Sequence, residues 1–314
     1  MFTFLLPAYK SAFLDEALRS IQEQTYTNFK VLISDDCSHE NIHAICEPYL
    51  NDLRFSYRRN ERNMGSKNLV SHWNLLVSLC DTEYCIMASD DDVYDTAFLD
   101  RINELTYKYP IVDLFRARTR KINEDGESYA IDCLYEEKEE PLEFLYSSFS
   151  QERTHCIGNY VFRTETLKKN GGFVDFLLGW FSDDATVSLC SFNGVVNTND
   201  ILFCFRNSHL NITYPSRKDP KMALEKIDAS CRFYDWMNDF ISSVPYSNTL
   251  YYNTMFERVR EGYKYRVKWL INTYYHQLGL SSFIKLIRRL KENGLLSSNI
   301  DLLYFVMRWI KQKL

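Results

Sequence analysis

Short apolar segments alternate with amphipathic segments through the first 110 residues of this chain. In the first amphipathic segment, Leu14, Leu18 and Ile21 recur at the spacing of one helical face, and Ser11 precedes them as a candidate N-cap. The expected strands are residues 2–6, 29–34, 53–58 and 84–88, and the expected helices are residues 14–22, 41–49, 69–80 and 97–109. This alternation is typical of an α/β fold with a Rossmann-like, mostly parallel central sheet flanked by helices.

The rest of the chain changes from a mixed pattern to a helical one. Expected strands are residues 112–117, 156–162 and 201–206, with a helix at 181–193 and only helices from residue 221 onward. We therefore expect an α/β domain at residues 1–215 and a helical C-terminal extension at residues 216–314. A chain of 314 residues is long enough for one large domain with such an appendage.

Clusters of carboxylates follow two of the expected strands. Asp36 closes a pair of acids after the second strand, and Asp90 and Asp91 begin a run of three acids after the fourth. Ligands of open α/β sheets bind at the carboxyl ends of the strands, and clustered carboxylates repel one another unless a cation neutralises them. Carboxylate oxygens suit Mg²⁺ or Mn²⁺, which also bind substrate phosphates. The pattern therefore indicates a metal-assisted site for a phosphorylated ligand. An acidic loop that caps the next helix explains the same residues, and on this stretch alone both readings stay open.

Several segments, in the same order along the chain, resemble family 2 glycosyltransferases with the GT-A fold. They are residues 4–9, residues 14–38, residues 63–65 with Asn74, residues 89–91, and residues 171–173 with Asp183 and Asp184 downstream. The resemblance covers residues 2–210. It implies a nucleotide-binding half at residues 1–110 and an acceptor-binding half at residues 111–215.

The resemblance implies an inverting, metal-dependent enzyme that transfers a sugar from a nucleotide-diphosphate sugar, with UDP as the expected nucleotide. The acceptor would be a saccharide or a lipid-linked glycan in surface polysaccharide synthesis. For the nucleotide, the resemblance implies that Pro7, Ala8 and Tyr9 line the base and that Asp36 hydrogen-bonds the base ring. In the DxD region, Asp91 would bind Mn²⁺ or Mg²⁺, and Asp90 would contact the ribose or the metal. Asp183 or Asp184 would activate the acceptor.

Two positions depart from the family pattern. Ser89 stands where many relatives carry the first Asp of the metal-binding region, and Cys37 stands where a glycine is common. Neither change removes Asp91, which we expect to be an exposed loop acid that leaves most metal positions to phosphate and water.

Adjacent helical residues point in different directions, so only one of Asp183 and Asp184 can face the sugar, and the other can cap the helix. The resemblance favours Asp183 slightly, because its distance from Gly194 fits the usual pattern of the family better. Trp180, just before this pair, is either a sugar-stacking residue or a core residue.

Four further residues have two interpretations each. Asn63 and Gly65 either approach the nucleotide sugar closely or form a plain turn. Arg206 either binds phosphate or makes a surface ion pair, and His209 either lies near the diphosphate or is a loop histidine without a role.

Charge is distributed unevenly along the chain. Residues 258–314 contain twelve Lys or Arg and three acids, although the whole chain has a net charge of −5. Within this tail, residues 282–291 and 300–311 are basic and amphipathic. They either lie on an anionic membrane surface or pack their apolar stripes on the protein. Peripheral contact with the inner face of the cell membrane would suit a lipid-linked acceptor.

The remaining features bound the location and the partners. The nine cysteines are scattered without metal-binding spacing, which favours free thiols in the cytoplasm. We read residues 1–7 as a first strand and not as a signal peptide, and we expect no membrane span and no nucleic-acid partner.

Two other functions compete with glycosyl transfer. A nucleotidyltransferase would need a glycine-rich basic loop after the first strand, which residues 7–11 do not supply. A catalytically silent module that binds sugar nucleotides is favoured only by Ser89.

Overall fold

The computed structural model describes residues 1–150, 153–211, 219–244, 249–274, 278–296 and 299–313. Its contacts divide the chain into two units. The first unit is Met1–Phe144, Arg153–Asp175 and Ser182–Asn207, and the second is Leu145–Glu152, Phe176–Phe181 and Ser208–Leu314. The domain boundary expected after residue 215 lies outside the described residues.

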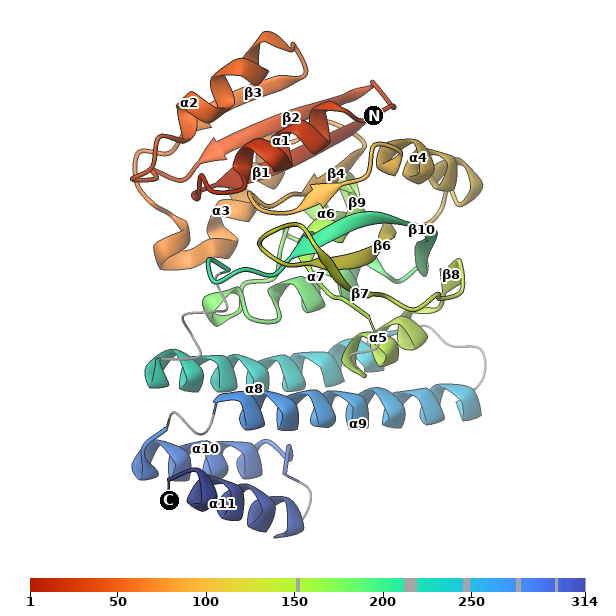
Figure 1. Ribbon diagram of the computed structural model, residues 1–314. Helices are drawn as coiled ribbons and strands as arrows, with labels where there is room; N and C mark the ends of the chain where they lie inside the picture. The colour runs from red at the N-terminus through yellow and green to blue at the C-terminus, as the bar shows by residue number, and fades with distance from the viewer. Residues whose placement is uncertain (151–152, 212–218, 245–248, 275–277, 297–298, 314) are drawn as a thin grey trace. The chain divides into compact units, whose positions relative to one another are not determined.

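A ten-stranded sheet forms the centre of the first unit (Figure 1). Its strands are β1 (Phe2–Ala8), β2 (Phe29–Asp35), β3 (Phe55–Arg59), β4 (Tyr84–Met87), β5 (Val93–Tyr94), β6 (Leu114–Ile122), β7 (Ser128–Ile131), β8 (Lys138–Glu139), β9 (Tyr160–Arg163) and β10 (Val195–Arg206). The main path runs β3-β2-β1-β4-β9-β6-β10-β5. The long ladders β1–β2, β2–β3, β1–β4 and β6–β10 are parallel, and β9 joins the two parallel halves as an antiparallel strand. The expectation of a mostly parallel α/β sheet is confirmed.

Helices cover both faces of this sheet. They are α1 (Leu14–Gln22), α2 (Ile42–Cys46), α3 (Gly65–Leu79), α4 (Phe98–Lys108), α6 (Thr164–Lys169) and α7 (Ser182–Cys190), while α5 (Pro141–Phe149) begins in the first unit and ends in the second. Phe2, Phe4 and Leu6 alternate along β1 and join one core with residues of α1, α2 and α4. Leu5 of the same strand is also fully buried. A strand buried on both faces reads as a continuous apolar run, which is why β1 has no polar alternation.

Two helix starts differ from expectation. Ser11 does not cap α1, since its backbone N–H bonds Glu40 Oε2 and no side chain caps that helix. Helix α3 begins at Gly65, four residues earlier than expected, and is interrupted by the non-helical backbone of Asn68. The Asn68 side chain accepts a hydrogen bond from the Ser71 backbone, so it caps the main body of the helix.

The second unit consists of helices and their connections in its described C-terminal part. The helices are α8 (Pro220–Ser243), α9 (Thr249–Tyr274), α10 (Leu280–Glu292) and α11 (Asn299–Lys313). Its core is aromatic: the rings of Phe181 and Phe233 stack at 4.7 Å, and Phe149 and Tyr263 pack against Phe233. The expectation of helices only beyond residue 221 holds for every described element. Across the described residues, no helix is both long and apolar enough to cross a membrane.

Candidate functional site

The carboxyl ends of three parallel strands bring residues 7–9, Asp36 and the loop with Asp90 and Asp91 to one edge of the sheet. The register pairs Ala8 with Asp35, and the Asp36 backbone N–H bonds the Ala8 carbonyl at 2.9 Å. On the other side of β1, β4 pairs in parallel and continues into the loop that holds Asp90 and Asp91. Three segments distant in sequence therefore meet at one edge of the sheet, where α/β proteins bind ligands.

Asp90 connects the β4 loop to the end of β1. Its Oδ2 accepts hydrogen bonds of 2.8 Å from the backbone N–H groups of Tyr9 and Lys10. Burial raises the pKa of Asp90, and the neighbouring Asp91 charge adds to this, whereas Lys10 and the two backbone donors work against it. The carboxyl group of Asp90 is thus held in place by the segment that carries the proposed base-lining residues.

Asp91 lies beside a cation of the chain itself. Lys10 Nζ is 3.0 Å from Asp91 Oδ2 and 3.3 Å from Asp90 Oδ1. Burial lowers the pKa of Lys10, but the charges and hydrogen bonds of the two aspartates outweigh it, and the net pKa is raised. Asp91 is only 7% exposed, so the expectation of an exposed loop acid is wrong.

Asp92, the third acid of the run, has a structural role. It accepts hydrogen bonds from Ser89 Oγ at 2.6 Å and from the Arg206 backbone at 2.9 Å. Burial, with a contribution from Asp91, raises the pKa of Asp92 to about 8. Ser89, which departs from the family pattern, therefore supports the loop through Asp92.

Arg206 is buried and forms an ion pair with Glu16, so the ion-pair interpretation holds except that the guanidinium is not at the surface. Its guanidinium donates to the Asp91 carbonyl at 2.9 Å, to the Asn123 carbonyl at 3.2 Å and to Glu16 Oε2 at 2.6 Å. This side chain joins β10, helix α1 and the acidic loop. It fixes the backbone of Asp91 and is not placed at the surface as a phosphate ligand or a solvated ion pair.

Asp36 organises the loop that leads into α3. Its Oδ1 accepts from Asn60 Nδ2 at 2.8 Å and from the Met64 backbone at 2.9 Å, and its Oδ2 accepts from the Gly65 backbone at 2.7 Å. A Cβ on Gly65 would lie 3.0 Å from Asp36 Oδ2, so a glycine allows this close approach. Asn63 caps the same turn by accepting from the Ser66 backbone at 2.8 Å.

Cys37 keeps the backbone conformation that the glycine of relatives would supply. Its φ is 55°, in the left-handed region that side chains rarely adopt. The next residue is anchored, since Ser38 Oγ donates to the Tyr9 carbonyl at 2.5 Å. The departure at residue 37 therefore leaves the turn after β2 in place, with backbone strain as its cost.

His155 joins the two acids proposed for acceptor activation. Its Nε2 is 3.7 Å from Asp183 Oδ2 and 3.6 Å from Asp184 Oδ1, and its Nδ1 is 2.8 Å from the Tyr160 hydroxyl. The three residues offer ligand atoms within 4.8 Å of one another, so they could hold a metal ion. The Asp183 side chain is 24% exposed and that of Asp184 is 3% exposed, and both lie in the first turn of α7.

The segment that follows His155 contacts the β4 loop. A Cβ on Gly158 would be 3.3 Å from Asp92 Oδ2, and the charge of Asp92 contributes to the raised pKa of Cys156, whose main cause is burial.

Two other sequence candidates fall in the second unit. Trp180 is half-buried, and Lys226 Nζ lies 3.9 Å from its ring centroid, so it is not a fully buried core residue and its role in sugar stacking stays a prediction. His209 is exposed in a turn.

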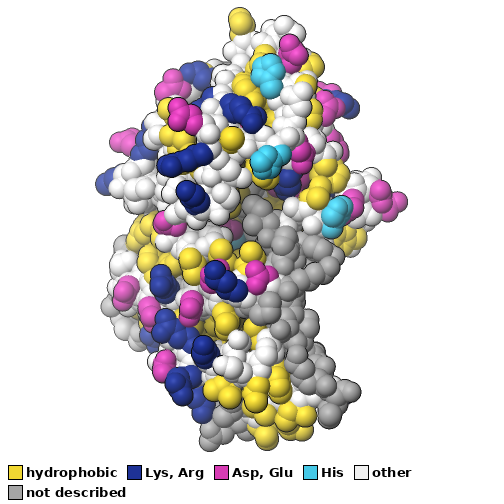
Figure 2. Space-filling view, turned by 90° about the vertical axis from the view of Figure 1, so that its left-hand side faces the viewer, with side chains coloured by type: hydrophobic (Ala, Val, Ile, Leu, Met, Phe, Trp, Pro, Cys, Tyr) yellow, Lys and Arg dark blue, Asp and Glu magenta, His cyan; other side chains and the backbone are white. Residues whose placement is uncertain are grey.

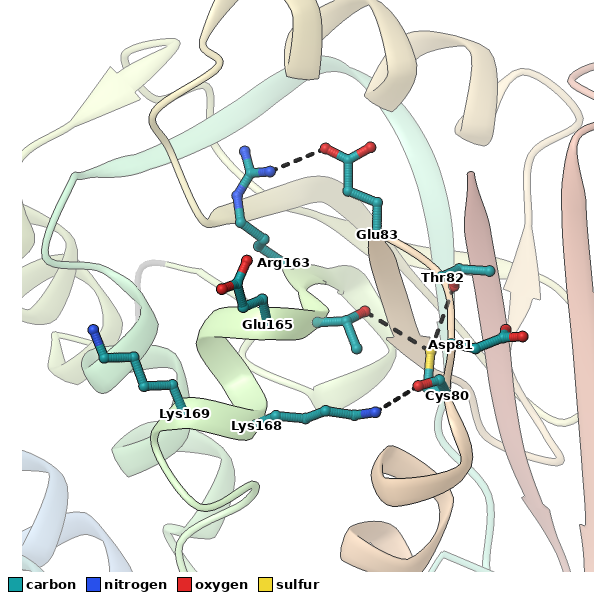
Figure 3. A pocket seen from close by; sticks show the side chains of 9 residues that line it. Cys80, Asp81, Thr82, Glu83, Arg163, Glu165, Lys168 and Lys169 are labelled. Carbon is teal, nitrogen blue, oxygen red and sulfur yellow. Dashed lines mark hydrogen bonds and ion pairs between the residues drawn. The ribbon is translucent and has the colours of Figure 1, made fainter.

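A pocket of about 600 Å³ lies at the opposite edge of the sheet, before the start of β4 (Figure 3). Some of the charged groups that line it are already engaged: Arg163 pairs with Glu83 at 3.0 Å, and Lys168 donates to the Cys80 carbonyl at 2.6 Å. It is therefore a separate feature from the acidic edge.

Sequence reasoning missed the roles of Lys10 and His155. Lys10 directly follows the base-lining segment, but nothing in the sequence says that its ammonium turns toward residues 80 positions later. His155 precedes Asp183 by 28 residues without a local motif. Only the fold brings each of them to its acids.

Comparisons with known proteins give the family and the fold of the chain. The sequence matches the model of glycosyl transferase family 2 over residues 3–169. It is 25% identical over 132 residues to protein CgeD of Bacillus subtilis, and the match covers 40% of this chain but only 31% of that relative. The chain thus spans about a third of the length of this curated relative.

Two solved structures share the fold. Residues 1–349 of S. aureus TarS in complex with UDP-GlcNAc superpose with a TM-score of 0.74 at 16% identity, covering 99% of this chain and 88% of that one. The mannosyltransferase PcManGT from Pyrobaculum calidifontis, in complex with GDP-Man and Mn²⁺, gives 0.57 at 13% identity, with coverage of 99% and 85%. At these identities the likeness is one of fold. Because the family model covers more than half of its residues, the chain belongs to glycosyl transferase family 2.

Proposed function

We propose that this enzyme transfers a sugar from a UDP-sugar, with inversion and with a divalent cation, to a saccharide or lipid-linked glycan acceptor. The observation that carries the proposal is the junction of Tyr9 and Lys10 with Asp90 and Asp91 at the carboxyl ends of β1 and β4. This junction puts the base-lining segment beside carboxylates suited to a cation. Surface polysaccharide synthesis at the inner face of the cell membrane is the setting that fits such an acceptor.

The residues present fit Mn²⁺ or Mg²⁺. A cationic group, the Lys10 ammonium, already lies against oxygens of both Asp90 and Asp91, so this position favours positive charge. Asp91 would hold the ion, with Asp90 beside it or on the ribose, and Mn²⁺ is present in the PcManGT complex. When bound, the ion stabilises the negative charge that develops on the diphosphate leaving group.

Asp183 is the acceptor base in this proposal. It is the more exposed of the two adjacent acids, whereas Asp184 is nearly buried. One carboxylate suffices for direct displacement, because the acceptor hydroxyl attacks from the face opposite the leaving group. His155 contacts both acids and would hold them in position.

The nucleotide would lie along the end of β1. Tyr9 is 37% exposed, which leaves its ring available to a base, and Pro7 and Ala8 precede it in the strand. Asp36 would accept from the base ring while it holds the loop of Asn63 and Gly65. Uracil is favoured because the TarS complexes contain UDP and UDP-GlcNAc, with a guanine nucleotide as the alternative that the GDP-Man complex suggests.

We assign residues 1–110 to donor binding, 111–215 to acceptor binding and 216–314 to a helical region. The exposed apolar and basic side chains of α10 and α11 suit peripheral membrane contact.

Turnover of a panel of nucleotide sugars with Mn²⁺ tests the proposal. Release of UDP, lost in Asp91→Asn and Asp183→Asn, supports it. The matched control is Asp81→Asn, since Asp81 pairs with Lys30 before the start of β4. Pyrophosphate release would indicate a nucleotidyltransferase, and binding without turnover a silent module; either result contradicts the proposal.

A further inference from the structure

A side-chain cation occupies the place where the proposed function needs a metal ion. Lys10 Nζ lies 3.0 Å from Asp91 Oδ2 and 3.3 Å from Asp90 Oδ1, and the Lys10 backbone N–H also bonds Asp90. The contacts are shielded from solvent, because the Lys10 side chain is 21% exposed and those of the aspartates are 7% and 10% exposed. Charge interactions in such surroundings are screened less than those at an open surface.

Two cations cannot share the oxygens that face Lys10. A divalent ion bound by Asp91 Oδ2 would lie close to the ammonium, and like charges at that separation repel strongly. We propose that the Lys10 ammonium holds the cation position in the free enzyme and that a divalent ion must displace it. The inference rests on the metal site of the proposed function, and it makes Lys10 a positioning residue that weakens metal binding until the donor arrives.

The donor supplies the reason for displacement. Its diphosphate brings negative charge to the same edge of the sheet, and a flexible lysine can turn from the carboxylates to a phosphate. Metal and nucleotide would then bind cooperatively, because each stabilises the arrangement in which Lys10 has left Asp91.

Mn²⁺ binding without nucleotide, followed by the electron paramagnetic resonance signal of free Mn²⁺, tests the inference. Lys10→Met should bind Mn²⁺ about tenfold more tightly than the wild type, because a positive charge next to the site is removed. Lys10→Arg keeps the charge and should resemble the wild type. The matched control is Lys30→Met, which removes an ammonium from the ion pair with Asp81. UDP should raise Mn²⁺ affinity more in the wild type than in Lys10→Met.

Unchanged or weaker Mn²⁺ binding in a folded Lys10→Met variant overturns the inference. Asp91→Asn, made in the wild-type and Lys10→Met backgrounds, separates this outcome from failure of the proposed function. If Asp91→Asn loses Mn²⁺ affinity in both backgrounds, the metal binds at Asp91, and the proposed function stands even where the inference about Lys10 fails. Affinity that responds to His155→Gln and not to Asp91→Asn would move the metal to the acid–histidine group, and both proposals about Asp91 would fail.

Discussion

At the scale of single residues, the Asp36 carboxylate stabilises the loop that leads into α3. It accepts from Asn60, Met64 and Gly65, so its removal leaves buried donors without their acceptor. Asp36→Ala should lower the free energy of unfolding by about 2–4 kcal/mol, measured by urea denaturation. Glu61→Ala, at an exposed position next to Asn60, should change it by less than about 0.5 kcal/mol. Equal losses in both variants would contradict this role.

His72 predicts a pH dependence of stability. The pKa of His72 is lowered, mainly because the imidazole is buried, and the positive charge of Arg58 lowers it further. The negative charge of Asp36, whose Oδ2 lies 3.7 Å from Nδ1, acts in the opposite direction. Above pH 6.5 the imidazole is neutral in both states, but below pH 6.5 the unfolded chain takes up the proton more readily. Stability should therefore fall as the pH drops below 6.5, with a contribution of up to about 1.4 kcal/mol per pH unit from His72.

Urea unfolding between pH 7.5 and 5 measures this contribution. His72→Gln should flatten the slope below pH 6.5, whereas His39→Gln, at an exposed position, should leave it unchanged. A wild-type slope in His72→Gln would show that another group causes the acid sensitivity.

At the scale of elements, two neighbouring glycines after α6 differ in what a side chain at each position would meet. Gly171 has φ 86° and open space where a Cβ would lie, whereas a Cβ on Gly172, at φ 85°, would lie 2.3 Å from Asn74 Oδ1. That amide bonds both the backbone N–H and the carbonyl of Phe173, at 2.6 and 2.9 Å. The close contact between α3 and this turn therefore depends on Gly172.

Gly171→Ala should cost about 1 kcal/mol of unfolding free energy, from the left-handed backbone alone. Gly172→Ala should cost about 3–5 kcal/mol, because Asn74 must also move. In an Asn74→Ala background the cost of Gly172→Ala should fall toward that of Gly171→Ala. Similar costs for the two single variants in urea denaturation would contradict the clash.

The same elements show what the sequence can predict. Strands with an apolar run, such as β1 and β4, are recognised because nearly every position is buried, and β2 is recognised by its central apolar run, residues 31–33. The strands β5 and β8 have two residues each, which is too short to show a periodicity. Each of them pairs with β10, more than 50 residues away in the sequence, so no local pattern predicts them. The acids at the strand ends are predictable because they directly follow strands that the sequence reveals. The positions of Lys10, His155 and Arg206 are not, because each depends on contacts across the sheet.

At the scale of the whole molecule, the basic C-terminal helices carry a second recognition surface in our proposal. Within α10, Phe283, Leu286 and Leu290 are buried, but Leu280 and Ile284 are more than half exposed. On α11, Leu303, Met307 and Ile310 are also exposed. The packing interpretation thus holds for one stripe, which is buried inside the second unit. Contact with a membrane stays a prediction, for which the exposed apolar side chains are the candidate residues. Figure 2 shows hydrophobic and basic side chains near one another at the foot of the view, where Figure 1 places α10 and α11.

Vesicle flotation tests whether this surface meets an anionic membrane. The protein should float with phosphatidylglycerol vesicles and not with phosphatidylcholine vesicles, because apolar side chains insert beside basic ones. Lys285→Gln with Arg288→Gln should weaken binding about thirtyfold, at about 1 kcal/mol for each charge near the surface. Ile284→Asn should weaken it as well, whereas Leu53→Asn, at a fully exposed position of the first unit, serves as the matched control. Binding that ignores lipid charge, or that responds equally to the control, would leave the basic tail as an ordinary solvated face.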